Sequence, residues 1–171
     1  MIFEAVIRFV DDLLTTIFTE VKMNNRTDQR VTVFVYGKLQ KGESNHGYLA
    51  SAQYLGPALS IDPLSMFIDL DTSIPVVTEQ PTTFISGELY LLPDARALAQ
   101  IDSLEGHPHN YQRKLILVDQ SRRVHKAWCY LFHHELDSAH VFLNTGNYKD
   151  RRLVKKTIPS VRADWESAWA A

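Results

Sequence analysis

The sequence predicts an α+β fold, in which a small mixed β-barrel or sheet has a central helix packed beside it and extra helices at both termini. Many short runs of β-branched and aromatic residues, separated by turn residues, predict the strands. Helical spacing of apolar residues occurs instead in a central stretch and near the chain ends. A chain of 171 residues can form one domain with its own core, which we expect at residues 31–153. Residues 1–30 and 154–171 are expected to be accessory segments.

The first accessory segment is a helix candidate, because its apolar residues recur at steps of three or four. Charged residues interrupt this stretch and no small-residue cleavage site follows it, which argues against a secretory signal. We expect a helix that packs on the domain or on a partner, unless Met23 rather than Met1 is the natural start. A polar linker at residues 24–30 follows. The apolar positions are Phe3, Val6, Val10, Leu13, Ile17 and Val21.

The second accessory segment is expected to form a short helix from Pro159 onward. Trp165 and Trp169 stand one helical turn apart on one face of it. Large apolar faces at both chain ends need a covering partner, since a monomer rarely leaves such a surface in water. We therefore expect the terminal helices to pack together or to form a homodimer.

Four stretches are the strand candidates on which the fold prediction depends. The first, residues 31–36, alternates valine with threonine and aromatic residues. The longest, residues 82–92, contains Gly87, which indicates a bulge or a close approach of another backbone. Residues 114–119 and 126–133 are expected to form a hairpin across a polar turn.

The central helix is expected between Asp94 and Gly106. Asp94 is a suitable N-cap, and Gly106 is followed by His-Pro, which ends a helix. Leu98, Ile101 and Leu104 recur at steps of three and mark the buried face.

Composition and charge exclude several function classes. The formal net charge of −2 gives no sequence-independent attraction to nucleic acid. No apolar run approaches the length of a membrane span. The single cysteine, Cys129, excludes an internal disulfide, which fits a reducing compartment, and we expect a cytoplasmic protein. Cys129 lies in an apolar run and is expected to be a buried core thiol.

The first candidate site lies where the opening strand stops, at Tyr36-Gly37. A strand that ends in glycine can present free backbone N–H groups, and such groups at Gly37 to Leu39 could hold an anionic oxygen. The alternative is a plain turn from strand to loop.

The second candidate is Glu105, at the C-terminal end of the predicted helix. That end carries partial negative charge, so ionisation of a carboxyl group is disfavoured there and the pKa of Glu105 should rise. A carboxyl group of this kind is a candidate general acid–base, and the alternative is an exposed surface glutamate.

Nearby, Tyr111 could close over a substrate or simply pack, and Arg113 is expected in a structural ion pair. His107 and His109 match no strong zinc signature, so no metal is expected.

Two motifs in this order resemble the γ-glutamylcyclotransferase family, closest to the γ-glutamylamine cyclotransferase branch and its bacterial relatives. The first is VFVYGKLQKGESNHGYL and the second is IDSLEGHPHNYQR. The family pattern of Tyr-Gly-Ser/Thr-Leu matches residues 36–39, and a D-x-x-E-G pattern matches residues 102–106. The resemblance covers roughly residues 31–153. Lys38 departs from it, because the family usually has Ser or Thr at that position.

The resemblance implies cyclisation of a γ-glutamyl group to 5-oxoproline with release of an amine, without metal or cofactor. It implies Glu105 as the catalytic group, and Tyr36, Gly37, Lys38, Leu39 and Tyr111 as substrate-binding residues. A catalytically silent ligand-binding or scaffolding member of the same fold is the alternative. The leaving amine stays open between free lysine, another amino acid, a polyamine and an aminoglycoside-like amine. Lys38 could attract a second carboxylate on the ligand.

Overall fold

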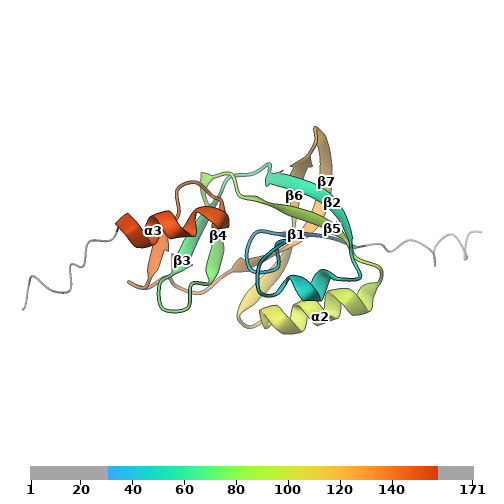
Figure 1. Cartoon of the computed structure of the whole chain (residues 1–171), viewed down its shortest axis with the longest axis horizontal. Coiled ribbons are helices and arrows are strands. Elements are labelled where there is room, and N and C mark those ends of the chain that lie inside the picture. Colours follow the sequence, from blue (N-terminus) through green and yellow to red (C-terminus); the bar gives the residue numbers. More distant parts are fainter. Residues whose placement is uncertain (1–30, 158–171) are drawn as a thin grey trace, which may run out of the picture. The chain divides into compact units, whose positions relative to one another are not determined.

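The computed structural model describes residues 31–157. They form a closed barrel, a smaller three-stranded sheet and short helices, so the predicted α+β class is confirmed (Figure 1). The barrel strands are β1 (Thr32–Val35), β2 (Gln53–Ser60), β5 (Ser86–Leu91), β6 (Tyr111–Gln120) and β7 (Arg123–Phe132). The sheet strands are β3 (Leu64–Asp69), β4 (Pro75–Thr83) and β8 (His140–Phe142). The helices are η1 (His46–Leu49), α2 (Ala95–Glu105), η2 (Tyr148–Asp150) and α3 (Arg151–Thr157).

The barrel has the strand order β1-β5-β2-β6-β7 and is mixed, because β1 closes it by pairing in parallel with β7. Strand β1 is buried on both faces. Phe34 belongs to the core that fills the barrel, while Val33 and Val35 pack against α2 and η1 on the outside. The apolar character of β1 on both faces therefore follows from its position between two packed layers.

The predicted strand over residues 82–92 is wrong as a single element. β4 ends in the small sheet at Thr83, and β5 begins in the barrel at Ser86. Between them Phe84 is half exposed, whereas Ile85 is fully buried and exchanges hydrogen bonds with Ser60. Apolar alternation continues through this crossing, so it does not reveal the change of sheet.

Gly87, inside β5, makes the close backbone approach that the sequence predicted. A Cβ atom on Gly87 would lie 2.4 Å from the carbonyl oxygen of Val35 and 2.7 Å from the ring of Phe34. Only glycine lets β5 lie this close to β1.

The central helix and the hairpin are confirmed. The Asp94 side chain accepts a hydrogen bond of 2.8 Å from the N–H of Ala97, and Gly106 caps the other end of α2 with a left-handed φ of 63°. β6 and β7 pair over their whole length around a turn at Ser121 and Arg122, which both have positive φ. α2 lies along the outside of the barrel beside η1 (Figure 1).

Helix α3 lies beside the small sheet, and its Val154 is buried in the same core as the barrel interior (Figure 1). The domain boundary expected after Leu153 falls inside this helix. The helix predicted at the N-terminus, and the one with Trp165 and Trp169, lie outside the described residues, as does the homodimer expected through them. Among residues 31–157, no helix is both long enough and apolar enough to cross a membrane.

Candidate active site

One pocket of about 310 Å³ brings together both stretches singled out in the sequence. Its walls come from the end of β1 and the following loop, the turn before β4, the end of α2 and the start of β6. The predicted site residues all line it, namely Tyr36, Gly37, Lys38, Leu39, Glu105 and Tyr111. The pocket is also lined by residues that no sequence pattern had indicated as part of a site, among them Ser44, Asn45, Ile74, Pro75, Leu104, Asn110 and Tyr130.

Glu105 is the last residue of α2 and is half buried in the pocket wall. Burial removes water from its carboxyl group and raises the pKa to about 7, from an ordinary value of 4.5. The carboxyl group makes no hydrogen bond or ion pair with any other residue in the described range. The pKa shifts in the predicted direction, but its cause is burial, which a position at the helix end did not reveal.

The last turn of α2 is fastened to the barrel by Asp102. The hydroxyl of Tyr130 donates a hydrogen bond of 2.7 Å to one Asp102 oxygen, and Arg113 forms an ion pair with the other. The structural ion pair predicted for Arg113 is thereby confirmed. These contacts fix the helix end and hold Glu105 against the pocket.

The strand end opposite Glu105 has the backbone geometry that the sequence indicated. Within the described part of the chain, the N–H groups of Lys38 and Leu39 donate no backbone hydrogen bond. Gly37 packs against Pro75, and a Cβ atom on Gly37 would lie 2.6 Å from the Pro75 ring. Glycine is therefore needed here for close packing between two walls of the pocket.

The hydroxyl group of Tyr36 has a structural role. It donates a hydrogen bond of 2.6 Å to the carbonyl of Tyr130, and burial raises its pKa well above the ordinary range. The backbone carbonyl of Tyr36 accepts a hydrogen bond of 2.6 Å from Gln40. Tyr36 thus shapes the pocket through its ring and fixes the start of the loop.

Tyr111 lies at the start of β6, with its hydroxyl 3.4 Å from the carbonyl of Pro75. Burial raises the pKa of this hydroxyl, and the nearby charge of Glu105 raises it further. The hydroxyl therefore stays protonated and can act only as a neutral donor or acceptor at the pocket wall.

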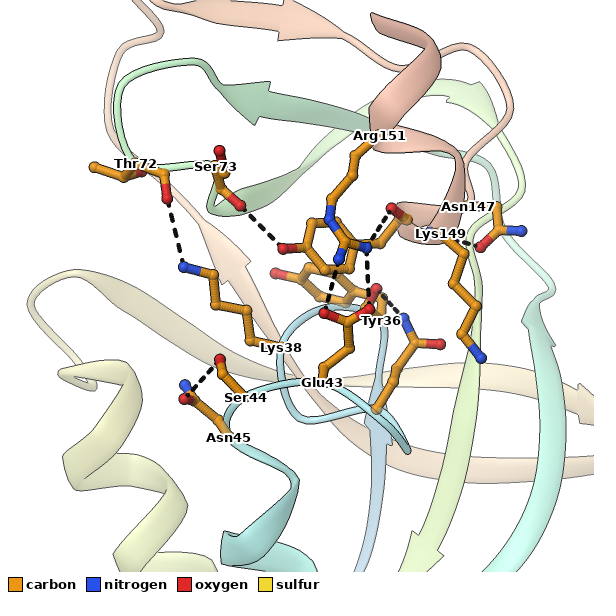
Figure 2. Close-up of polar contacts among 12 residues, drawn as sticks. Tyr36, Lys38, Glu43, Ser44, Asn45, Thr72, Ser73, Asn147, Lys149 and Arg151 are labelled. Carbon is orange, nitrogen blue, oxygen red and sulfur yellow. Dashed lines mark hydrogen bonds and ion pairs between the residues drawn. The ribbon is translucent and has the colours of Figure 1, made fainter. Parts of the chain in front are cut away.

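The loop between β1 and β2 is tied to the chain segment around η2, a relationship that no sequence pattern indicated. Arg151 donates two hydrogen bonds of 3.0 Å to the Glu43 carboxylate and stacks on the ring of Tyr148 (Figure 2). The Tyr148 hydroxyl donates 3.0 Å to the carbonyl of Ser73, in the turn before β4. Arg151 and Tyr148 therefore connect the loops on both sides of the pocket. We call this arrangement the η2 clamp.

A second contact joins these two loops directly. The Lys38 ammonium lies 3.5 Å from the carbonyl oxygen of Thr72 (Figure 2).

Cys129 is a buried free thiol, as predicted, and burial raises its pKa above the ordinary range. Among the described residues, no group of His, Cys, Asp and Glu side chains is arranged to hold a metal ion.

Several known proteins share sequence or fold with this chain. The family model described as gamma-glutamyl cyclotransferase, AIG2-like, matches residues 33–150. A Methanocaldococcus jannaschii protein, provisionally named a gamma-glutamylcyclotransferase, is 36% identical over 124 residues, which is 70% of this chain and 97% of that protein. The human gamma-glutamylaminecyclotransferase is 32% identical over 93 residues, covering 50% of this chain and 60% of the human protein. The crystal structure of a mouse AIG2-like protein has a TM-score of 0.57 at 22% identity, covering 65% of this chain and 90% of the mouse chain, and it supports the fold.

Proposed function

Because the chain belongs to the gamma-glutamyl cyclotransferase, AIG2-like family, we propose that it cyclises a γ-glutamyl group to 5-oxoproline and releases an amine. The observation that carries the proposal is the position of Glu105, a half-buried carboxyl group, in one pocket with the strand end at Gly37. Within residues 31–157, Glu105 has no hydrogen-bond or ion-pair partner, and the N–H groups of Lys38 and Leu39 donate no backbone hydrogen bond. Nucleophile and carbonyl belong to the same substrate molecule, so holding that molecule in a folded conformation supplies much of the rate.

Glu105 would manage the proton of this reaction. The ionised carboxylate accepts a proton from the substrate α-ammonium, and the freed α-amine attacks the γ-carbonyl carbon. A carbon–nitrogen bond forms, and the attacking nitrogen releases its second proton to solvent as it becomes the lactam nitrogen. The bond from carbon to the leaving nitrogen breaks as Glu105 returns the first proton to that nitrogen, so that 5-oxoproline and a free amine result. A pKa of about 7 suits both tasks near neutral pH, because the group can accept and donate a proton at similar cost.

The strand end would hold negative charge. The N–H groups of Lys38 and Leu39 can donate to the substrate α-carboxylate or to the oxygen that becomes negative during attack. Donors fixed in a loop before the substrate arrives need no reorganisation during the reaction.

The test is incubation of the full chain with a panel of γ-glutamyl compounds while 5-oxoproline is measured. We expect turnover of at least one compound, and loss of about two to four orders of magnitude in kcat for Glu105→Gln with unchanged circular dichroism. Full activity of Glu105→Gln would contradict the catalytic role of Glu105. Binding of γ-glutamyl compounds without any 5-oxoproline would favour the catalytically silent ligand-binding alternative.

A further inference from the structure

We propose that Lys38 selects γ-glutamyl substrates whose leaving amine carries a carboxylate. This inference rests on the proposed function and concerns the same pocket. It assigns the Lys38 side chain to the leaving group, and not to the glutamyl part of the substrate.

The first support is the charge of the pocket lining. Among the described residues that line the pocket, Lys38 is the only cationic side chain and Glu105 the only carboxylate. The two do not form an ion pair with each other. Within residues 31–157 the Lys38 ammonium contacts one polar group, the neutral carbonyl of Thr72 at 3.5 Å, and no carboxylate of that range forms an ion pair with it.

The two carboxylates near Thr72 do not compensate Lys38. Asp71 is exposed and forms no ion pair with Lys38 in the described part of the chain, and Asp69 is occupied within its own turn. Asp69 accepts hydrogen bonds from the N–H groups of Asp71 at 2.8 Å and Thr72 at 3.2 Å, and from the Thr72 hydroxyl at 2.7 Å. These contacts lower the pKa of Asp69 and occupy its carboxylate with donors of its own turn. Lys38 therefore remains available to an anion that enters the pocket.

The second support is the direction of the side chain. Lys38 extends from the loop after β1 across to the turn that contains Thr72 (Figure 2). Its own N–H group and that of Leu39 stay at the strand end. The N–H groups of Lys38 and Leu39 and the Lys38 ammonium group can thus contact different parts of one bound molecule.

The third support is the charge of the substrate. A γ-glutamyl group has one α-ammonium and one α-carboxylate. Glu105 serves the first and the strand-end N–H groups can serve the second, so the Lys38 charge has no counterpart in the glutamyl part. A carboxylate on the leaving amine would supply it.

The experiment compares two nearly isosteric substrates, γ-glutamylglycine and γ-glutamylglycinamide, which differ in one negative charge. We expect the ratio of their kcat/KM values to fall roughly tenfold from the parent protein to Lys38→Met, as for loss of one charge-assisted hydrogen bond. Differences in the reactivity of the two leaving amines cancel, because the ratio is compared between proteins. Lys38→Arg should retain most of the preference.

Lys41→Met is the matched control. It removes the same charge from the same loop, but Lys41 is exposed and does not line the pocket, so the substrate ratio should not change. An equal loss for both substrates in Lys38→Met would assign Lys38 to the α-carboxylate and overturn the inference, as would an unchanged ratio. Turnover of neither compound by the parent protein, while a γ-glutamyl compound whose leaving amine lacks a carboxylate yields 5-oxoproline, would overturn this inference alone. Absence of 5-oxoproline from every compound of the panel would contradict the proposed function, and this inference with it.

Discussion

Arg151 and Glu43 are 108 positions apart in the chain, yet they form a bidentate ion pair in which both hydrogen bonds are 3.0 Å long. Both side chains are largely buried, with 23% and 16% of their surfaces exposed. A paired guanidinium and carboxylate with this geometry is a specific contact, because two parallel hydrogen bonds fix both distance and orientation. It fixes the loop that follows β1, which lines the pocket.

The first prediction concerns this ion pair. Arg151→Met should lower the free energy of unfolding by about 1–3 kcal/mol, because it leaves the Glu43 carboxylate without its partner. It should also raise KM more than it lowers kcat, since the loop binds substrate while Glu105 lies on another element. Thermal melting and steady-state kinetics measure the two effects.

Arg152→Met is the matched control for this variant, because Arg152 is the next residue and its side chain is exposed. It should behave like the parent protein. Equal effects of the two substitutions would mean that the η2 clamp does not position the loop. The double variant Glu43→Gln with Arg151→Met should lose less than the sum of the single losses.

The second prediction concerns stability and pH. The pKa of Glu105 is about 7 in the folded protein against an ordinary 4.5, so between these values the folded state holds a proton that the unfolded chain has released. The free energy of unfolding should therefore decrease as pH rises from about 4.5 to 7. Glu105→Gln removes this penalty and should be more stable than the parent at pH ~8, by at most about 3 kcal/mol.

Denaturant titrations of both proteins at several pH values measure this difference. The two proteins should have similar stability near pH ~4. At that pH the Glu105 carboxyl group is protonated in the folded state and largely protonated in the unfolded state, so its ionisation no longer favours unfolding. A stability difference that is the same at every pH would mean that the pKa of Glu105 is not raised.

The third prediction concerns activity and pH. Because Glu105 must be ionised to accept the substrate proton, kcat/KM should fall on the acid side with a midpoint near pH 7, where its pKa lies. The measurement is a pH profile of kcat/KM for any compound that yields 5-oxoproline. A profile that is flat down to pH ~5 would exclude Glu105 as the base.

The fourth prediction concerns Gly37. Alanine at this position would place its Cβ atom 2.6 Å from the Pro75 ring, so one wall of the pocket must move. We expect Gly37→Ala to destabilise the fold by about 1–3 kcal/mol and to weaken substrate binding. Gly47→Ala is the control, because nothing lies within 4 Å of its Cβ position. Similar melting temperatures for the two variants would contradict the packing role of Gly37.

The sequence predicted the elements that local chemistry determines. Asp94 and Gly106 identified both ends of α2, because a side-chain N-cap and a left-handed C-cap act within a few residues. The crossing at Ile85 was missed, because apolar alternation does not reveal which sheet a strand joins. The ion pair between Arg151 and Glu43 was missed as well, because it depends on tertiary proximity and no local sequence pattern encodes it.

The candidate site was predictable to a similar extent. The strand end at Gly37 and the helix end at Glu105 were visible in the sequence, and both line the pocket. The reason for glycine at position 37 was not visible, because it is the ring of Pro75 in a distant turn. The burial that raises the pKa of Glu105 likewise exists only after folding.

The pocket walls are contributed by segments that are far apart in the chain, from Val35 through Pro75 and Glu105 to Tyr130. No single segment contains all the walls of the pocket, so a partly folded chain lacks the complete binding site. Substrate turnover can therefore serve as a direct readout of the fully assembled barrel. In an equilibrium denaturant titration, activity and the near-ultraviolet signal of the aromatic core should disappear together, even where secondary structure persists.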